Sequence, residues 1–258
     1  MMRRRITWLI AEVVAAGLIL GLPTVASAQP PAPAPAAAAP SAPWTGNVGF
    51  GLALNRGNSS TTNLNFSFDV DHNLKTASVW KFTGLYLRGT DNGSLAVDQL
   101  NIEGRNERAL TDRAYAFGQL QFLRDHFKAI DYLWAPSVGV GYKAIDSTAT
   151  TLNLDAGLGF QVEQYTALPR HTNAVVTASD KLEEKFSSTA SLTQGFDALW
   201  KVQAFGDALY TFRAGAAASM TTHSQLKVEW LDTYATRPPV PTVKSNDSAL
   251  LTTLVYTF

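Results

Sequence analysis

Cysteine is absent from this chain of 258 residues. No disulfide framework can therefore form, and no cysteine is available to carry a lipid anchor. Charged residues are also scarce, at 16% against roughly 25% in ordinary globular domains. Because basic and acidic residues balance to a net charge of +0, the chain lacks the basic surface of a nucleic-acid-binding protein. We expect no nucleic-acid partner.

Long apolar runs are missing after residue 22, although hydrophobic residues make up 46% of the chain. A transmembrane helix needs roughly 20 consecutive apolar residues, so this part of the chain offers no candidate for one. The apolar residues instead alternate with polar ones. That is the period of a β-strand with one apolar face and one polar face.

The N-terminus has the pattern of an export signal. Three arginines at 3–5 precede a mostly apolar run over 6–22, and Ala26-Ser27-Ala28 has the small-x-small arrangement that signal peptidase cleaves. A retained membrane anchor is the alternative, but Glu12 interrupts the run and Pro23 ends it. We therefore predict a signal peptide over 1–28, cleaved after Ala28.

A Pro/Ala-rich segment follows at 29–43. This composition cannot form a packed core, and it favours extended polyproline conformations. We interpret the segment as a periplasmic linker, with a disordered tail of no particular role as the alternative.

Alternation is clearest in two stretches, 62–71 and 152–163. The apolar side of the first is formed by Leu64, Phe66, Phe68 and Val70, and its polar side by Asn63, Asn65, Ser67, Asp69 and Asp71. A soluble β-sandwich would show the same period. The runs, however, exceed the usual 5 to 6 residues of soluble strands and approach the roughly 9 to 11 that cross a bilayer. Length thus favours a membrane barrel.

About 12 strands can be counted. We predict them at 44–55, 60–72, 77–89, 94–109, 112–125, 130–145, 149–164, 171–185, 187–199, 206–221, 224–236 and 246–258. The even number and short connections are typical of a bacterial barrel. The predicted fold is therefore all-β, a transmembrane up-and-down antiparallel β-barrel spanning 44–258.

The C-terminal residues LLTTLVYTF at 250–258 form an alternating strand that ends on an aromatic residue. Tyr256 and Phe258 resemble the C-terminal assembly signal of outer-membrane proteins, which implies the barrel assembly machinery and outer-membrane lipids as partners. We expect this strand to pair with 45–54 and close the sheet. Both termini are predicted to be periplasmic, so the odd-numbered connections would be extracellular, and the connection at 233–247 would be the only long one.

Several segments in a fixed order resemble one known family. They are Trp44-Thr45-Gly46-Asn47-Val48, Arg56-Gly57-Asn58-Ser59, Leu110-Thr111-Asp112-Arg113, Phe122-Leu123-Arg124-Asp125-His126-Phe127, Val138-Gly139-Val140-Gly141-Tyr142 and Leu254-Val255-Tyr256-Thr257-Phe258. The chain is similar over 44–258 to the salt-induced outer-membrane protein family, a domain of unknown function. The resemblance implies an outer-membrane barrel of a Gram-negative-type bacterium, and it supplies no catalytic residue.

Charged residues on the lumen side of the predicted strands are the candidate functional groups. They are Asp69, Lys81, Glu103, Arg105, Glu107, Asp155, Glu163, Lys181, Glu183, Arg213, Lys227 and Glu229. An unpaired charge in a narrow lumen is costly, so we expect opposite signs to pair across strands. The alternative is a pore that selects ions by rings of charge.

Catalytic chemistry finds little support. Arg124 and Asp125 precede His126 near a strand end. Adjacent strand residues point to opposite faces, so Asp125 and His126 are poorly placed to share a catalytic site. We expect Arg124 to pair with a carboxylate and hold the loop in place. His223 and Ser224 are neighbours in a turn, unlike the separated pair of outer-membrane phospholipases. We expect no enzyme activity, no cofactor and no metal site.

Three functions remain open. The first, which we favour, is an envelope or stress-related barrel with a narrow lumen and a role in passing small solutes. The second is an outer-membrane hydrolase of phospholipase or protease type. The third is an adhesion or partner-binding barrel that uses the connection at 233–247.

Overall fold

The computed structural model describes residues 44–56, 60–74, 77–126, 128–166, 168–238 and 244–258. The predictions of a signal peptide at 1–28 and a linker at 29–43 lie outside the described residues. Twelve strands are present: β1 (Trp44–Arg56), β2 (Ser60–Asn73), β3 (Ser78–Asp91), β4 (Ser94–Ala109), β5 (Ala114–Asp125), β6 (Ile130–Asp146), β7 (Thr150–Tyr165), β8 (His171–Lys185), β9 (Ala190–Lys201), β10 (Ala204–Ser219), β11 (Ser224–Ala235) and β12 (Asn246–Thr257). No helix among the described residues is long and apolar enough to span a membrane.

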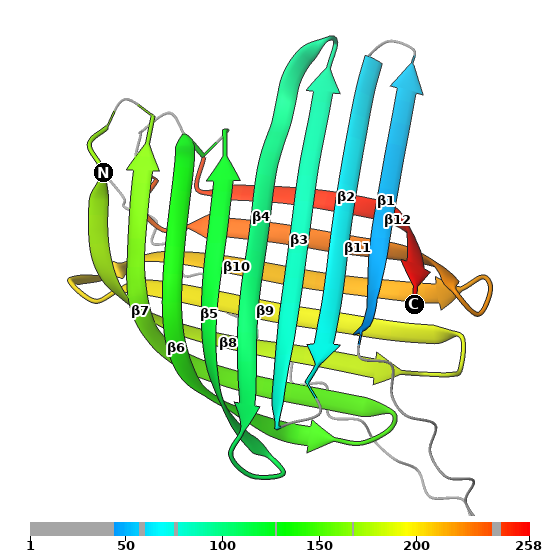
Figure 1. Cartoon of the computed structure of the whole chain (residues 1–258). Coiled ribbons are helices and arrows are strands. Elements are labelled where there is room, and N and C mark those ends of the chain that lie inside the picture. Colours follow the sequence, from blue (N-terminus) through cyan, green and yellow to red (C-terminus); the bar gives the residue numbers. More distant parts are fainter. Residues whose placement is uncertain (1–43, 57–59, 75–76, 127, 167, 239–243) are drawn as a thin grey trace, which may run out of the picture. The chain divides into compact units, whose positions relative to one another are not determined.

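The strands form one closed antiparallel barrel in which each strand pairs with its sequence neighbours. Strands β1 and β12 close it, with Asn47 opposite Thr257 and Phe50 opposite Leu254. The strands of opposite walls cross at a steep angle (Figure 1), as tilted strands of a closed barrel do. The predictions of twelve strands and an up-and-down topology are confirmed.

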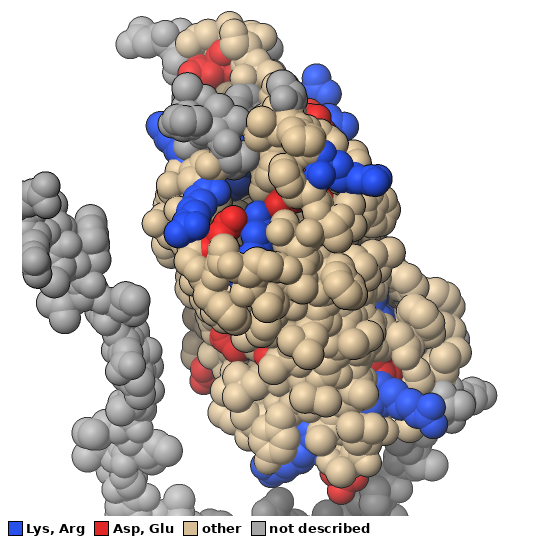
Figure 2. All heavy atoms as spheres, turned by 90° about the vertical axis from the view of Figure 1, so that its left-hand side faces the viewer, with Lys and Arg blue, Asp and Glu red and all other residues tan. Residues whose placement is uncertain are grey.

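The alternation of the sequence becomes an inside and an outside. On β7, Leu158 and Phe160 are 63% and 60% exposed on the outer surface, whereas Gln161 and Glu163 on the inner side are 3% and 2% exposed. Figure 2 shows one face of the barrel, where charged side chains gather mainly toward the two ends and a broad uncharged expanse lies between them. Such a band matches the hydrocarbon region of a bilayer.

We call the end of the barrel with Trp44 and Phe258 the terminal end, and the opposite end the far end. Short turns at the terminal end repeat one device, a hydroxyl that accepts a hydrogen bond from the backbone three residues ahead. The Oγ1 of Thr111 accepts from the N–H of Ala114 at 2.8 Å, and Thr221 accepts from Ser224 at 3.0 Å. Ser147 and Ser187 act in the same way before β7 and β9.

The connection between β3 and β4 is a two-residue turn, Asn92-Gly93, at the far end. Both residues have positive φ, 49° and 80°, as a type I′ hairpin turn requires. Asn and Gly are the residues that adopt this conformation at least cost, so the local sequence fixes this reversal.

Exposed aromatic side chains lie toward both ends of the strands. Trp44, Trp80, Tyr142 and Tyr256 lie toward the terminal end. The far-end half carries Trp134, Trp230 and Tyr234. Aromatic residues at these two levels are typical of membrane-interface girdles.

Candidate functional site in the barrel lumen

The candidate site lies in the barrel lumen, and its wall includes two glycines of β6, Gly139 and Gly141. A Cβ on Gly141 would overlap the ring of Tyr115, and one on Gly139 would lie 2.5 Å from the ring of Phe117. These two rings from β5 therefore lie close against the wall where a side chain would otherwise project. The guanidinium carbon of Arg105 in turn lies 3.8 Å from the centroid of the Phe117 ring, a cation–π contact.

Arg105 connects three neighbours from this position and is only 8% exposed. Its Nε donates to Glu107 at 2.8 Å, its Nη1 to Gln119 at 2.9 Å and its Nη2 to Asp155 at 2.8 Å. The Tyr115 hydroxyl also donates to Asp155, at 2.7 Å. Because each of its three nitrogens donates to an acceptor in the wall, the arginine is a rigid part of that wall.

Other charges pair in the same region. The amine of Lys181 on β8 lies 3.7 Å from Asp69 on β2, two strands that are not neighbours in the barrel. Arg213 pairs with Asp197 at 2.8 Å, and Lys227 pairs with Glu229 on its own strand. The Lys181–Asp69 pair thus links separate parts of the wall across the lumen.

A cavity of about 630 Å³ lies in the lumen, between the terminal end and Leu199 and Leu209. We call it the vestibule. Eleven of the twelve charges predicted as lumen candidates line it: Asp69, Lys81, Glu103, Arg105, Glu107, Asp155, Lys181, Glu183, Arg213, Lys227 and Glu229. Glu103 is among them and forms no ion pair with any described residue. Serines of the β8–β9 turn and Thr257 also line the vestibule, so it reaches the terminal end.

Apolar side chains end the vestibule toward the far end. Leu199 and Leu209 border both the vestibule and a second cavity beyond it. They belong to a packed cluster with Leu123, Leu133 and Val175. A second apolar cluster, Leu87, Leu231 and Leu251 with Leu85, lies on the inner faces of β3, β11 and β12. We call these two clusters together the septum.

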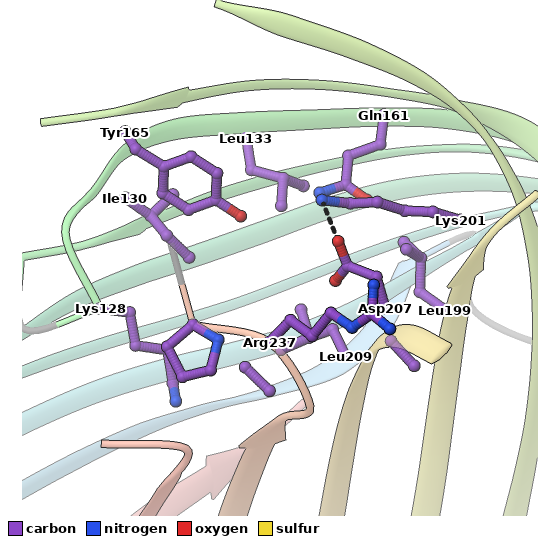
Figure 3. Close-up of a pocket in the computed structure, with 13 residues that line it drawn as sticks. Lys128, Ile130, Leu133, Gln161, Tyr165, Leu199, Lys201, Asp207, Leu209 and Arg237 are labelled. Carbon is purple, nitrogen blue, oxygen red and sulfur yellow. Dashed lines mark ion pairs between the residues drawn. The ribbon is translucent and has the colours of Figure 1, made fainter. Parts of the chain in front are cut away.

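Glu163 lies beyond the septum, apart from the other eleven candidates. Its Oε1 accepts from Lys201 at 2.6 Å and from Asn173 at 3.0 Å, and its Oε2 accepts from the Tyr165 hydroxyl at 2.7 Å and from Gln161. Lys201 continues the network to Asp207 at 3.1 Å. Figure 3 shows the Lys201 amine pointing at the Asp207 carboxylate, with Arg237 beside it.

The second cavity, beside this network, measures about 30 Å³, enough for a water molecule. The Oε1 of Gln161 is buried without a hydrogen-bond partner among the described residues, and Gln161 lines this cavity. A water molecule there would satisfy it. The cavity is too small for a solute.

Lys128 closes the far end over this cavity. It is 2% exposed, and its amine contacts Asp247 at 2.9 Å and the carbonyl of Thr233 at 3.4 Å. Arg237 and Pro238, which follow β11, also line the cavity. Through Lys128, the β5–β6 turn therefore contacts the far ends of β11 and β12.

Arg124 and Asp125, the pair predicted near a loop, point to opposite faces of the barrel wall. Arg124 on the outer face pairs with Asp98 at 2.9 Å, and Asp125 is buried inside, where it accepts from the N–H of Lys128 at 3.1 Å. His223 lies in the β10–β11 turn with its Nδ1 3.2 Å from the carbonyl oxygen of Thr257. The hydroxyl of the adjacent Ser224 is 2.7 Å from that of Thr221.

Sequence reasoning missed Lys128, Lys201, Asp207 and Asp247, together with the septum. A signal for the septum was present, because Leu85, Leu87 and Leu199 occupy lumen-side positions of the alternation. The far-end ion pairs had no such signal. Lys128 and Asp247 were expected in surface connections.

The chain is similar in sequence to one curated protein and in fold to solved structures. "Uncharacterized protein YdiY" of Escherichia coli (strain K12) is 23% identical over 216 residues, covering 83% of each chain. The crystal structure of the COG4313 outer membrane channel from Pseudomonas putida F1 matches with a TM-score of 0.52 and 13% identity over 89% of this chain and all of the other. The NanC porin matches with a TM-score of 0.49 and 12% identity over 83% of this chain and 98% of the other.

The similarity to the Pseudomonas putida channel shows a fold of the bacterial outer-membrane β-barrel type. A family profile described as "Protein of unknown function, DUF481" matches residues 48–258, nearly the whole barrel. The chain belongs to this family.

Proposed function

We propose that this protein is a narrow, non-enzymatic channel for small hydrophilic solutes, closed in the conformation described above. One observation carries the proposal, a charged vestibule of about 630 Å³ that ends on the septum. Wet, charged walls suit a hydrophilic solute, and an apolar constriction stops ions and water by dewetting. The similarity to an outer-membrane channel at fold level supports the same conclusion.

The balance of charge in the vestibule favours weak ion selectivity. Of the lining side chains that the alternation directs inward, seven are acidic and six are basic. The acidic ones are Asp69, Glu103, Glu107, Asp155, Glu183, Asp197 and Glu229, and the basic ones are Lys81, Arg105, Lys181, Lys185, Arg213 and Lys227. Since most of them pair with each other, neither cations nor anions gain a strong preference.

Conductance across planar bilayers tests the proposal. Leu199 and Leu209, which separate the two cavities, are replaced together by serine. We expect rare, small openings for the refolded wild-type protein and several-fold larger, more frequent openings for the double variant, because a polar constriction no longer dewets.

A matched control replaces Leu110 by serine, because this exposed leucine lies in the β4–β5 turn. Its currents should equal those of the wild type. Heat-modifiable gel mobility establishes that every variant is folded. Folded septum variants whose currents match those of an empty bilayer would disprove the channel.

The setting of this channel is part of the proposal. A cleaved signal peptide would deliver the chain to the outer membrane of a Gram-negative-type bacterium, where the barrel assembly machinery would insert it with both termini in the periplasm. The vestibule would then open to the periplasm and the septum would lie toward the cell exterior. A protease that cleaves a tag at Phe258 only after the outer membrane is permeabilised would support this orientation.

The absence of enzyme activity is also proposed. The histidine contacts of the β10–β11 turn support it, since the Ser224 hydroxyl contacts Thr221 and the Nδ1 of His223 contacts a backbone carbonyl. A serine hydrolase needs the histidine to accept the proton of the serine. Lipid turnover by the wild type that His223→Ala abolishes would overturn this part.

A further inference from the structure

An acidic side chain, Asp180, lies on the outer surface of the barrel. Its chain neighbour Lys181 forms an ion pair with Asp69 across the lumen, so the Lys181 side chain points inward, and successive side chains of a strand point to opposite faces. Its register partners are Leu154 on β7 and Phe196 on β9. Both are exposed apolar residues of the outer face, so Asp180 is surrounded by the surface that meets lipid.

The hydrogen-bonded row through Asp180 shows its depth. This row runs from Tyr142 on β6 through Leu154, Asp180, Phe196 and Phe212 to Asp232 on β11. Because strands tilt, such a row climbs from one membrane interface toward the other. Tyr142 lies toward the terminal end and Asp232 toward the far end. Asp180 is two strands from the first and three from the second, and it therefore lies near mid-depth.

Lipid gives this carboxylate no hydrogen bonds. The Nε2 of Gln194 on β9 donates to its two oxygens at 3.3 and 3.1 Å. A carboxylate can accept about four hydrogen bonds, and hydrocarbon contains no donor. The amide oxygen of Gln194 has no partner among the described residues either. A polar pair with unused donors and acceptors thus faces the bilayer.

Leu154 and Phe196 flank Asp180 directly, and small side chains lie on the other positions next to the pair. Ala178 precedes Asp180 on the outer face of β8, and Ala214, Ala216 and Ala218 form the outer face of the neighbouring half of β10. Elsewhere the outer face carries bulky residues such as Phe50. Small residues let two membrane proteins approach closely enough for polar groups to meet.

We propose that this face, Ala178, Asp180 and Leu182 of β8 with Gln194 and Phe196 of β9, binds a second copy of the chain. The patch is complementary to itself, which indicates a second copy of the chain as the partner. A two-fold axis brings the same patch to itself, and the patch holds both an acceptor, Asp180, and a donor, Gln194. Each carboxylate then receives the amide of the other copy. This inference does not depend on whether the barrel conducts.

Cross-linking tests the interface directly, because the chain has no cysteine. Leu182→Cys places one thiol beside the pair, since Leu182 is the register partner of Gln194. Phe50→Cys places a control thiol on the outer face of β1, well away from β8 in the strand order. In outer membranes treated with a bismaleimide, we expect a band of twice the barrel mass from Leu182→Cys and none from Phe50→Cys. Equal yields, or no such band from Leu182→Cys, would overturn the proposal.

A second measurement removes the polar pair. Asp180→Leu with Gln194→Leu gives a surface suited to lipid, so the barrel should still fold and stay heat-modifiable. Energy transfer between labelled copies in liposomes should show dimerisation weakened about tenfold, equivalent to about 1.4 kcal/mol. Thr252→Leu, on the outer face of β12, is the control and should change nothing. Unchanged dimerisation in the double variant, or cross-links to another protein in place of a second copy, would refute the inference.

Discussion

Glu163 is the best-connected buried charge of the far end. Four donors, from Gln161, Tyr165, Asn173 and Lys201, satisfy its two oxygens, and it is 2% exposed. A buried carboxylate is tolerated only when its hydrogen bonds are complete. The same residue therefore holds β7, β8 and β9 in register behind the septum.

Replacing Glu163 by Gln should strongly destabilise the barrel. The amide removes the negative charge opposite Lys201 and leaves donors facing donors, and breaking a buried ion pair typically costs about 3–5 kcal/mol. Urea unfolding in lipid vesicles, followed by tryptophan fluorescence, measures the loss. Glu183→Gln is the control, because Glu183 lies 3.9 Å from Lys185 at a partly exposed site and should cost under about 1 kcal/mol. Similar losses in both variants would contradict this account of Glu163.

Strand β6 illustrates how an element shapes the lumen by what it lacks. Its inner face carries Gly139 and Gly141, and the rings of Phe117 and Tyr115 fill the space that side chains would take. Arg105 is then supported by these rings and reaches Asp155 on β7. The position of Arg105 in the lumen wall thus depends on glycines on one strand and aromatics on the next.

Gly141→Ala should therefore disturb β5 as well as β6. The new methyl group would overlap the Tyr115 ring and the Asp155 carboxylate, and overpacking of this kind costs about 1–3 kcal/mol. Gly118→Ala is the matched control, since its Cβ would lie 4.0 Å from the nearest atom, and it should stay within about 0.5 kcal/mol of the wild type. The same unfolding assay compares the two. Equal stability would mean that the wall adapts without cost.

Local pattern was enough to predict the elements themselves. Each predicted strand boundary lies within three residues of the observed one, because alternation and turn chemistry are written in adjacent residues. The local sequence pattern did not predict the pairings across the lumen. Lys181 and Asp69 meet only when β8 and β2 are brought together by closure, and register irregularities such as the one between Ala204 and Ala208 shift partners without a local signal. The lumen-side leucines were visible in sequence, yet only their convergence makes a septum.

The barrel closes where β1 pairs with β12, and this seam is the shortest of its strand pairings. Strand β1 pairs with β2 along its full length but with β12 only from Asn47 to Phe50. Beyond Phe50, the side chain of Asn65 on β2 reaches past Gly51 to the Thr252 carbonyl at 3.5 Å and accepts from the Thr253 hydroxyl at 2.9 Å. A buried amide thus takes the place of missing backbone pairing where the first and last strands meet.

Deletion of Phe258 should impair assembly more than any other property. Its N–H donates to the carbonyl of Gly46 at 3.0 Å, and its carbonyl accepts from the N–H of Gly46 at 3.1 Å. The deletion removes both bonds from a seam that is already short. The heat-modifiable fraction in isolated outer membranes should fall several-fold.

Phe258→Tyr keeps the backbone and the aromatic ring, and it should assemble like the wild type. Protein that does insert without Phe258 should show wild-type conductance, because Phe258 does not line the vestibule. Normal assembly of the truncated chain would mean that Asn65 and the remaining pairs close the barrel without the last residue. Equal defects in both variants would instead assign the effect to the phenylalanine side chain alone.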